Sequence, residues 1–314
     1  MVLAVVALLV SGEACLRQRL QMVARAESKV AGPVGWYRVK PSLGVNWRGL
    51  ATIPARDLEN KIEAEDDDYD EDRRLDDRLR DRFDRSLSML MLDKDSNCGS
   101  LLATEELKGP VFIFVHGIGG IGSEWWAVVP TLEKMQPSAM FMFRWSATQT
   151  RDKILERLVT GINRITACSP GVRLVVLSHS AGGVLLSFAA SRLTVDGAKK
   201  LELLTCASPL AGIGFHSKID NADDDTRFFN DLGSTKDGFT AAAPNVFVTH
   251  YRTSYPGDQV MKPNVFGHSP NLRGIKVEGA TEVDLPIELT HEGSLLYVAQ
   301  QLALDAGVKL PTQP

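Results

Sequence analysis

The sequence predicts an α/β fold with a mostly parallel sheet and helices on both of its faces. Short, continuous apolar runs alternate with helix-like stretches, and 44% of the 314 residues are hydrophobic. Continuous apolar strands indicate a sheet that is covered on both faces, and alternation with helices favours βαβ units. The expected strands span residues 111–115, 139–143, 173–177, 201–205, 245–251 and 275–277. The expected helices span residues 124–134, 151–165, 183–193 and 289–302.

The most informative motif follows the expected strand at 173–177. The apolar run stops at Ser178, and Ser180 stands among small residues before a helix-like apolar pattern begins. Such a strand–turn–helix unit holds a serine hydroxyl clear of the backbone, and the first turn of the helix offers N–H groups to an anion. Ser180 is therefore the candidate nucleophile. An ordinary connection between a strand and a helix is the simpler alternative.

A second glycine-rich turn follows the expected strand at 111–115 and begins with His116 and Gly117. Glycines allow backbone N–H groups to point inward, because no Cβ interferes. Ligands of parallel sheets bind beyond the carboxyl ends of the strands, where both turns fall.

The two turns together resemble the nucleophile elbow and the oxyanion loop of the α/β-hydrolase superfamily. The elbow of that family reads small-x-Ser-x-Gly, and Ser178 stands where glycine is commonest. The resemblance covers roughly residues 109–304 and implies that Ala181 and either Ile118 or Gly119 donate the N–H groups of an oxyanion hole. It also implies that His116 orients the loop rather than acting as a base. Fixed donors lower the barrier because an ester carbonyl becomes an oxyanion during attack.

The superfamily places its remaining catalytic residues after the serine, in the order acid and then histidine. His291 lies near the C-terminus, just before a helix-like run, where the resemblance places the catalytic base. His250 falls inside an expected strand, which favours a structural role. His216 and His268 lie in polar stretches and remain alternative bases.

Asp258 is the expected acid, because it follows a Pro–Gly turn just after the expected strand at 245–251. This carboxylate would hold the imidazole in the useful tautomer and stabilise its cation. Asp284 and Glu278 are the rival carboxylates.

These residues imply a serine hydrolase that cleaves carboxylic esters through an acyl-enzyme, similar to an esterase or a lipase. An acyltransferase or an amidase would use the same triad, and a non-catalytic interaction protein on a hydrolase fold is the alternative of a different class. Dehalogenases and epoxide hydrolases need an aspartate at the elbow and are excluded by Ser180. The candidates for lining the substrate pocket are His116, His179 and Trp125, although Trp125 fits a core position equally well.

A small-molecule or lipid ester is the expected substrate, and no cofactor is expected. The cysteine and histidine spacing does not suggest a metal site. The densely charged stretch at 59–85 mixes both signs, which disfavours nucleic-acid binding and indicates a solvated helix or spacer. The polar insertion at 211–244 is where members of the superfamily place a cap or lid.

The N-terminal 15 residues predict a signal peptide or a lipoprotein-type anchor. The apolar run at 2–10 is too short to span a bilayer but fits the core of a signal peptide. A small residue before Cys15 resembles a lipoprotein cleavage site, whereas Glu13 and the absence of a preceding Lys or Arg depart from it. We expect export to the cell envelope and membrane attachment through Cys15, with a cytoplasmic location as the alternative.

The expected organisation is an N-terminal extension at 16–100 followed by a catalytic domain at 101–314. Cys98 and Cys168 each lie shortly before an expected core strand. They either form a disulfide, which an oxidising compartment would preserve, or remain free thiols.

Overall fold

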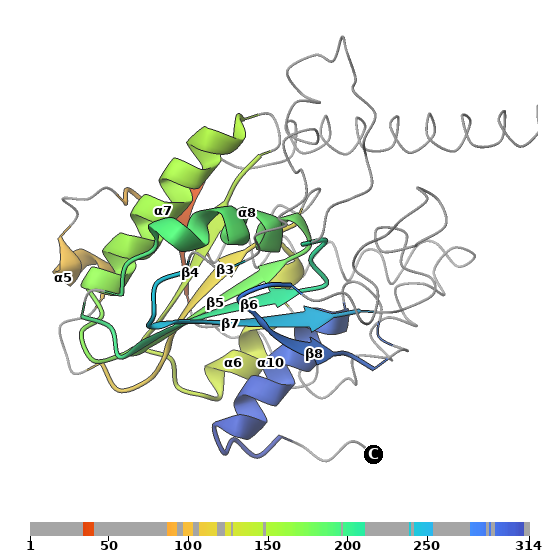
Figure 1. The fold of residues 1–314 in the computed structure, drawn as a ribbon. Helices are drawn as coiled ribbons and strands as arrows, with labels where there is room; N and C mark the ends of the chain where they lie inside the picture. Colours follow the sequence, from red (N-terminus) through yellow and green to blue (C-terminus); the bar gives the residue numbers. More distant parts are fainter. Residues whose placement is uncertain are drawn as a thin grey trace, which may run out of the picture.

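In the computed structural model, the strands of the described residues form one mixed sheet (Figure 1). The structure describes residues 34–40, 87–92, 97–102, 107–117, 123–126, 128–146, 149–195, 197–210, 239, 242–253, 277–286, 289 and 293–310. The sheet has eight strands in the order β2-β1-β4-β3-β5-β6-β7-β8. Neighbouring strands from β4 through β8 are parallel, whereas β1 is antiparallel to both β2 and β4. The predicted α/β class with a mostly parallel sheet is confirmed.

Strands β3 to β7 coincide closely with the expected apolar runs, whereas β1, β2 and β8 lie outside them. The strands are β1 (Gly35–Val39), β2 (Leu87–Leu90), β3 (Val111–Val115), β4 (Ala139–Arg144), β5 (Arg173–His179), β6 (Lys200–Cys206), β7 (Val246–Arg252) and β8 (Thr281–Asp284). Every residue of β3 and β4 is buried, as expected for central strands that are covered on both faces.

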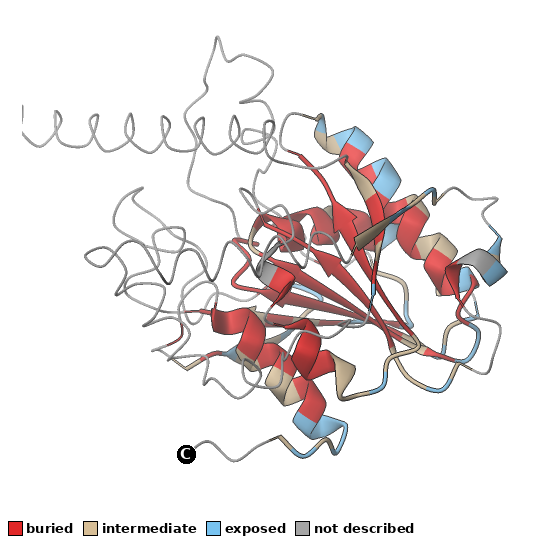
Figure 2. Ribbon diagram, turned by 180° about the vertical axis from the view of Figure 1, so that it is seen from behind, coloured by how far each residue is buried: buried red, intermediate tan, exposed pale blue. Residues whose placement is uncertain are grey.

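Helices cover both faces of the sheet. They are α5 (Cys98–Leu101), the 3-10 helix η2 (Ser123–Trp126), α6 (Val129–Glu133), α7 (Arg151–Ala167), α8 (Ala181–Ala189), the 3-10 helix η3 (Ala190–Arg192) and α10 (Gly293–Asp305). Helices α7 and α8 lie on one face, and α6 and α10 lie on the other (Figure 1). Figure 2 shows that the sheet between them is almost wholly buried. Two hydrophobic clusters result, one on each side of the sheet.

All four expected helices differ in their bounds, α7 only by two residues at its C-terminal end. The stretch expected as one helix at 124–134 is divided into η2 and α6, and Pro130 occupies the first turn of α6, where its missing N–H costs no hydrogen bond. Helix α8 starts at Ala181, two residues earlier than expected, and continues into η3. Helix α10 runs from Gly293 to Asp305, and the stretch expected as a helix from residue 289 begins too early.

The last strand lies at Thr281–Asp284, so the prediction of a strand at 275–277 is wrong in position. Val277 precedes a turn in which the N–H of Ala280 donates to the Val277 carbonyl, and Gly279 has a φ of 77°. A left-handed residue at this point reverses the chain, and β8 then pairs with β7.

Two strands from the stretch expected as an N-terminal extension, β1 and β2, take part in the sheet. Strand β1 inserts next to β4, and β2 extends the sheet at its edge. Trp36 is buried in the cluster beneath α7, and its indole Nε1 donates to the Arg157 carbonyl at 3.1 Å. The stretches at 1–15 and 59–85 lie outside the described residues.

A disulfide joins Cys98 to Cys168, resolving the choice that the sequence left open. Cys98 is the first residue of α5, and Cys168 caps the C-terminus of α7. The bond therefore ties the segment before β3 to the far end of a major helix. The third described cysteine, Cys206, is free and buried, and burial raises the pKa of its thiol well above the usual range.

The contact between Trp36 and α7 predicts that Gly161→Ala destabilises the protein. A Cβ at Gly161 would overlap the indole ring of Trp36. Alanine gains about 1 kcal/mol of helix propensity, whereas overpacking costs about 1–3 kcal/mol, and the rigid ring makes the second effect larger. We expect a net loss of about 1 kcal/mol in the free energy of unfolding, measured by urea denaturation.

Glu156→Ala provides the control, because Glu156 lies exposed on the same helix. That change should alter the free energy of unfolding by less than about 0.5 kcal/mol. A Gly161→Ala protein as stable as the unchanged chain would contradict this account of the β1–α7 contact.

Candidate active site

Ser180 alone makes the turn between β5 and α8. Strand β5 ends at His179, helix α8 begins at Ala181, and Ser180 has φ 50° and ψ −125°. A side chain other than glycine rarely adopts this backbone conformation, which costs on the order of 1–3 kcal/mol and persists only where its surroundings enforce it. The turn leaves Ser180 half-buried although both of its neighbours are buried. This is the sharp strand-to-helix turn that the sequence predicted.

Backbone hydrogen bonds hold the turn against the neighbouring strand. The N–H of Ser180 donates to the Cys206 carbonyl at 3.0 Å, and the N–H of Gly183 donates to the Ser180 carbonyl at 3.0 Å. Cys206 ends β6 and is the register partner of His179. The next residue, Ala207, also has a positive φ, of 47°. Two adjacent parallel strands therefore end in tight turns side by side.

Two glycines allow the surrounding backbone to close on Ser180. A Cβ at Gly182 would lie 2.5 Å from the carbonyl oxygens of both Val115 and His116. A Cβ at Gly117 would lie 2.9 Å from the Cβ of Ser180. The turn after β3 is thus packed directly against the turn after β5, as an oxyanion loop and a nucleophile elbow require.

Gly183 serves a different contact, which the sequence reasoning missed. A Cβ at Gly183 would overlap the hydroxyl of Ser208, which follows β6 and is fully buried. The Ser178 hydroxyl donates to the Leu204 carbonyl at 3.1 Å, so serine in place of the commoner glycine is accommodated by a hydrogen bond to β6. The presence of small residues at both positions was the signal available in the sequence.

Only part of the expected oxyanion hole lies within the described residues. Ala181 is the first residue of α8, so its N–H lies in the first turn, where a helix supplies no carbonyl partner and its dipole favours negative charge. Ile118 and Gly119 lie outside the described residues. The segment that carries them departs from Gly117, which is packed against Ser180.

His116 is a buried structural residue of the loop after β3. Its Nε2 accepts the backbone N–H of Trp145 at 3.0 Å, so Nδ1 carries the proton and donates to the Gly117 carbonyl at 2.7 Å. The ring also stacks on Trp145, whose indole Nε1 donates to the His116 carbonyl at 2.9 Å. Burial lowers the pKa of His116 to about 4. These contacts commit both ring nitrogens and favour the loop-orienting role over a pocket-lining one.

The other two pocket candidates are also buried. Trp125 is fully buried and stacks on Phe114 at a centroid distance of 4.9 Å, which makes it part of the core rather than of a pocket wall. His179 is buried beside Ser180, and its Nδ1 would lie 3.4 Å from a Cβ at Gly117.

His250 lies on β7, as a structural sheet histidine should. Its Nδ1 lies 2.8 Å from the Thr205 hydroxyl on β6. Burial, together with the nearby positive charge of Arg252, lowers the pKa of His250 to about 4. A histidine kept neutral by burial and hydrogen-bonded between strands is poorly suited to act as a mobile base.

Among the acid candidates, only the two rivals lie within the described residues. Asp284 ends β8 and is bound by Arg252, whose Nε and Nη2 lie 3.0 Å and 2.9 Å from Oδ1 of Asp284. A carboxylate already committed to a guanidinium is a weaker candidate for orienting a histidine. Glu278 lies in the turn before β8.

Asp258 and His291 lie outside the described residues, as do His216 and His268. The segments that carry Asp258 and His291 start after β7 and β8. These strands are parallel to β5, so the two segments leave the sheet at the carboxyl ends of the strands, where Ser180 also lies.

Within the described residues, no cluster of three or more His, Cys, Asp or Glu residues has the arrangement of a metal site. The described helices also include none that is both long and apolar enough to cross a membrane.

Comparison with known proteins finds likeness only at the level of structure. No protein-family model and no curated protein matches the sequence. Est1E from Butyrivibrio proteoclasticus is 15% identical over 66% of this chain and 92% of its own, with a TM-score of 0.43. An enol-lactonase from Burkholderia xenovorans LB400 is 12% identical over 63% and 91%, with a TM-score of 0.40. Esterase B from Lactobacillus rhamnosis is 10% identical over 65% and 78%, with a TM-score of 0.43.

The fold is an α/β fold in which helices flank a mostly parallel sheet and a serine turn joins β5 to α8.

The buried histidines predict that the protein loses stability in mild acid. His116 and His250 have pKa values lowered to about 4 in the folded chain, whereas an unfolded histidine titrates near 6.5. As the pH falls from about 6.5 to about 4, the unfolded chain binds more protons, and the free energy of unfolding decreases. The decrease approaches about 3 kcal/mol for each histidine.

His250→Asn isolates one of the two contributions, because an amide can keep the hydrogen bond to Thr205 without titrating. Urea unfolding between pH 7 and pH 4 measures how many protons the chain takes up when it unfolds. This number should be smaller by up to one in the variant. An unchanged dependence would contradict the assignment of His250 as a buried neutral group.

Proposed function

We propose that this protein is a serine hydrolase that cleaves carboxylic esters in the manner of an esterase or a lipase. Ser180 is the nucleophile, His291 the general base, and Asp258 the acid that orients the histidine. The observation that carries the proposal is the backbone of Ser180, which is held at a positive φ where α8 begins and where the loop after β3 packs against it. Strained backbone conformations at residues other than glycine cluster at active sites, which supports a chemical role for Ser180.

In the proposed reaction, Ser180 Oγ attacks the ester carbonyl carbon while His291 accepts the hydroxyl proton. The carbonyl oxygen becomes an oxyanion that accepts hydrogen bonds from the N–H of Ala181 and from that of Ile118 or Gly119. The tetrahedral intermediate expels the alcohol, which takes its proton from His291. Water, activated by His291, then releases the acid from the acyl-enzyme and restores the Ser180 hydroxyl.

The proposal includes export to the cell envelope, with membrane attachment through Cys15. The disulfide between Cys98 and Cys168 supports an oxidising compartment, because reducing compartments rarely preserve such bonds. The proposed substrate is a lipid or small-molecule ester. The proposed catalytic domain includes β1 and β2 in its sheet.

An activated serine predicts covalent labelling by a fluorophosphonate at Ser180. The purified chain should gain the mass of the adduct, and peptide mapping should place the adduct on Ser180. Ser180→Ala should remove both the label and the hydrolysis of p-nitrophenyl esters. Ser187→Ala is the matched control, since Ser187 is a buried serine of α8 whose hydroxyl donates only to its own helix, at Val184.

No label on the folded, unchanged chain would contradict the proposed function, as would a label retained by Ser180→Ala. Acyl transfer to an added alcohol in preference to water would instead identify an acyltransferase with the same serine.

The order of the triad predicts graded losses. His291→Gln should lower kcat by about 10⁴-fold or more, because the serine loses its base. Asp258→Asn should cost less, since the histidine remains in place. Steady-state hydrolysis of p-nitrophenyl butyrate measures both variants.

Near-normal turnover by His291→Gln would move the base elsewhere, with His268 as the next candidate. A fully active Asp258→Asn protein would transfer the acid role to Asp284 or Glu278.

A further inference from the structure

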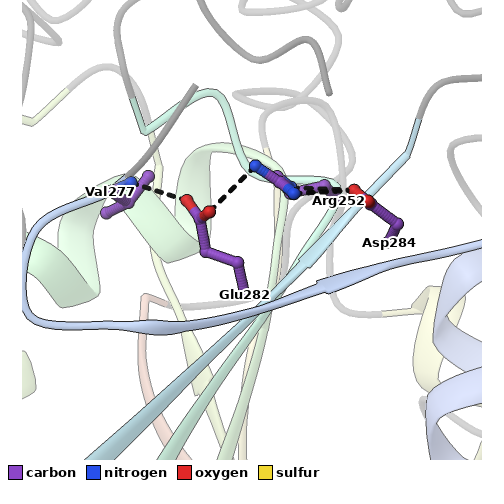
Figure 3. A network of polar contacts seen from close by, with 4 residues as sticks. All are labelled: Arg252, Val277, Glu282 and Asp284. Atoms are coloured by element: carbon purple, nitrogen blue, oxygen red, sulfur yellow. Dashed lines mark hydrogen bonds and ion pairs between the residues drawn. The ribbon is translucent and has the colours of Figure 1, made fainter. Parts of the chain in front are cut away.

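Arg252 joins the ends of the last two strands through an ion-pair cluster in which Arg252 and Glu282 are largely buried and Asp284 is exposed. Arg252 is the final residue of β7, and its side chain is only 9% exposed. Its Nη1 donates to Glu282 Oε2 at 2.9 Å, and its Nε donates to Asp284 Oδ1 at 3.0 Å. Both carboxylates belong to β8, and Figure 3 shows the guanidinium lying between them. The planar fork of arginine suits two carboxylates at once, which a lysine ammonium cannot match.

The cluster also fixes the backbone on both sides of β8. Glu282 uses its second oxygen, Oε1, to accept the N–H of Val277 at 2.6 Å, which closes the turn before the strand (Figure 3). The Arg252 carbonyl accepts the N–H of Leu285 at 2.9 Å, just beyond the end of β8. The contacts therefore bind the last residue of β7 to the segments that enter and leave β8.

Thr253 extends this connection toward the proposed base. Its hydroxyl is buried and donates to the Leu289 carbonyl at 3.2 Å. Leu289 stands two residues before His291, and Thr253 stands five residues before Asp258. The segments that carry the proposed acid and the proposed base thus leave the sheet from one cross-linked point. A displacement there would reach both segments at once.

We propose that Arg252 is a positioning residue that sets the placement of Asp258 relative to His291. This inference rests on the proposed function. Arg252 acts through Glu282 and Asp284, which hold β8 against β7, and through the two segments that depart from these strands. Misplacing catalytic groups by about 1 Å can cost as much as about 100-fold in rate, so loosening this cluster should be visible in turnover.

The sharpest test compares Arg252→Met with Arg173→Met. Arg173 also makes a two-point ion pair, to Glu202 at 2.6 Å and 3.0 Å. It stands at the start of β5, however, whereas Ser180 follows the end of that strand. Both changes remove a paired guanidinium and keep much of the aliphatic stem. A purely structural role predicts the same behaviour from both variants.

We expect Arg252→Met to lower kcat for p-nitrophenyl butyrate by at least about tenfold, with KM within about twofold of the unchanged enzyme. The acid limb of the profile of kcat/KM against pH should move to lower pH, because His291 loses part of the stabilisation of its cation by Asp258. Fluorophosphonate labelling of Ser180 should slow in parallel. Arg173→Met should leave kcat, the pH profile and the labelling rate unchanged at a temperature where both variants are folded.

Each outcome separates the inference from the function on which it rests. If the unchanged protein takes no label at Ser180, the proposed function fails, and the inference fails with it. If the unchanged protein is labelled and Arg252→Met matches it in rate and pH profile, the positioning role is overturned while the function stands. Equal losses in both arginine variants would also overturn it.

Glu282→Gln carries the same test if Arg252→Met does not fold. This variant keeps the shape of the side chain and removes one of the two ion pairs of Arg252. A fall in kcat with an acid limb moved to lower pH supports the inference, and an unchanged profile overturns it.

Discussion

The structure depends on the close approach of three backbone turns around Ser180. Helix α8 can begin directly after β5 only if one residue reverses the chain, and that residue adopts φ 50° at a serine. Gly117 and Gly182 make the approach physically permissible, because a Cβ at either position would meet neighbouring atoms within 2.9 Å. His116 then fixes the loop after β3 through both of its ring nitrogens. The strain at Ser180 is therefore maintained by packing that spans two strands and one helix.

The rest of the fold holds the turns around Ser180 in position. Parallel strands direct the turns after β3, β5, β6, β7 and β8 to one edge, so groups remote in the sequence converge there. Strand β1 completes the face beneath α7 with Trp36, and the Cys98–Cys168 disulfide fastens the end of that helix. At the far side of the site, Arg252 ties β7 to β8. Rigid elements thus carry the segments in which chemistry is proposed.

Much of the fold could be predicted because the burial of strands and helices leaves apolar runs in the sequence. Strand β3 and the start of α7 lie where the apolar runs indicated, and the serine turn was visible as small residues between a strand and a helix. Strands β1 and β2 were missed because both are short and lie far from the other strands in the sequence, so no local pattern separates them from loops. The cluster at Arg252 was missed because ion pairing depends on register between strands. The one sign of the cluster is the alternation of buried and more exposed residues along β7, which places the charged side chain of Arg252 at a buried position.

The central claim is that packing forces Ser180 into a conformation that favours glycine. Comparing the free energies of unfolding of Ser180→Gly and Ser180→Ala tests this most directly, since both variants lack the hydroxyl. At an ordinary position with negative φ, glycine would be the less stable by about 0.4–1 kcal/mol, because it gains more freedom in the unfolded chain. Our account predicts the opposite sign, with Ser180→Gly more stable by about 1 kcal/mol because the strain is relieved. A less stable glycine variant would contradict it.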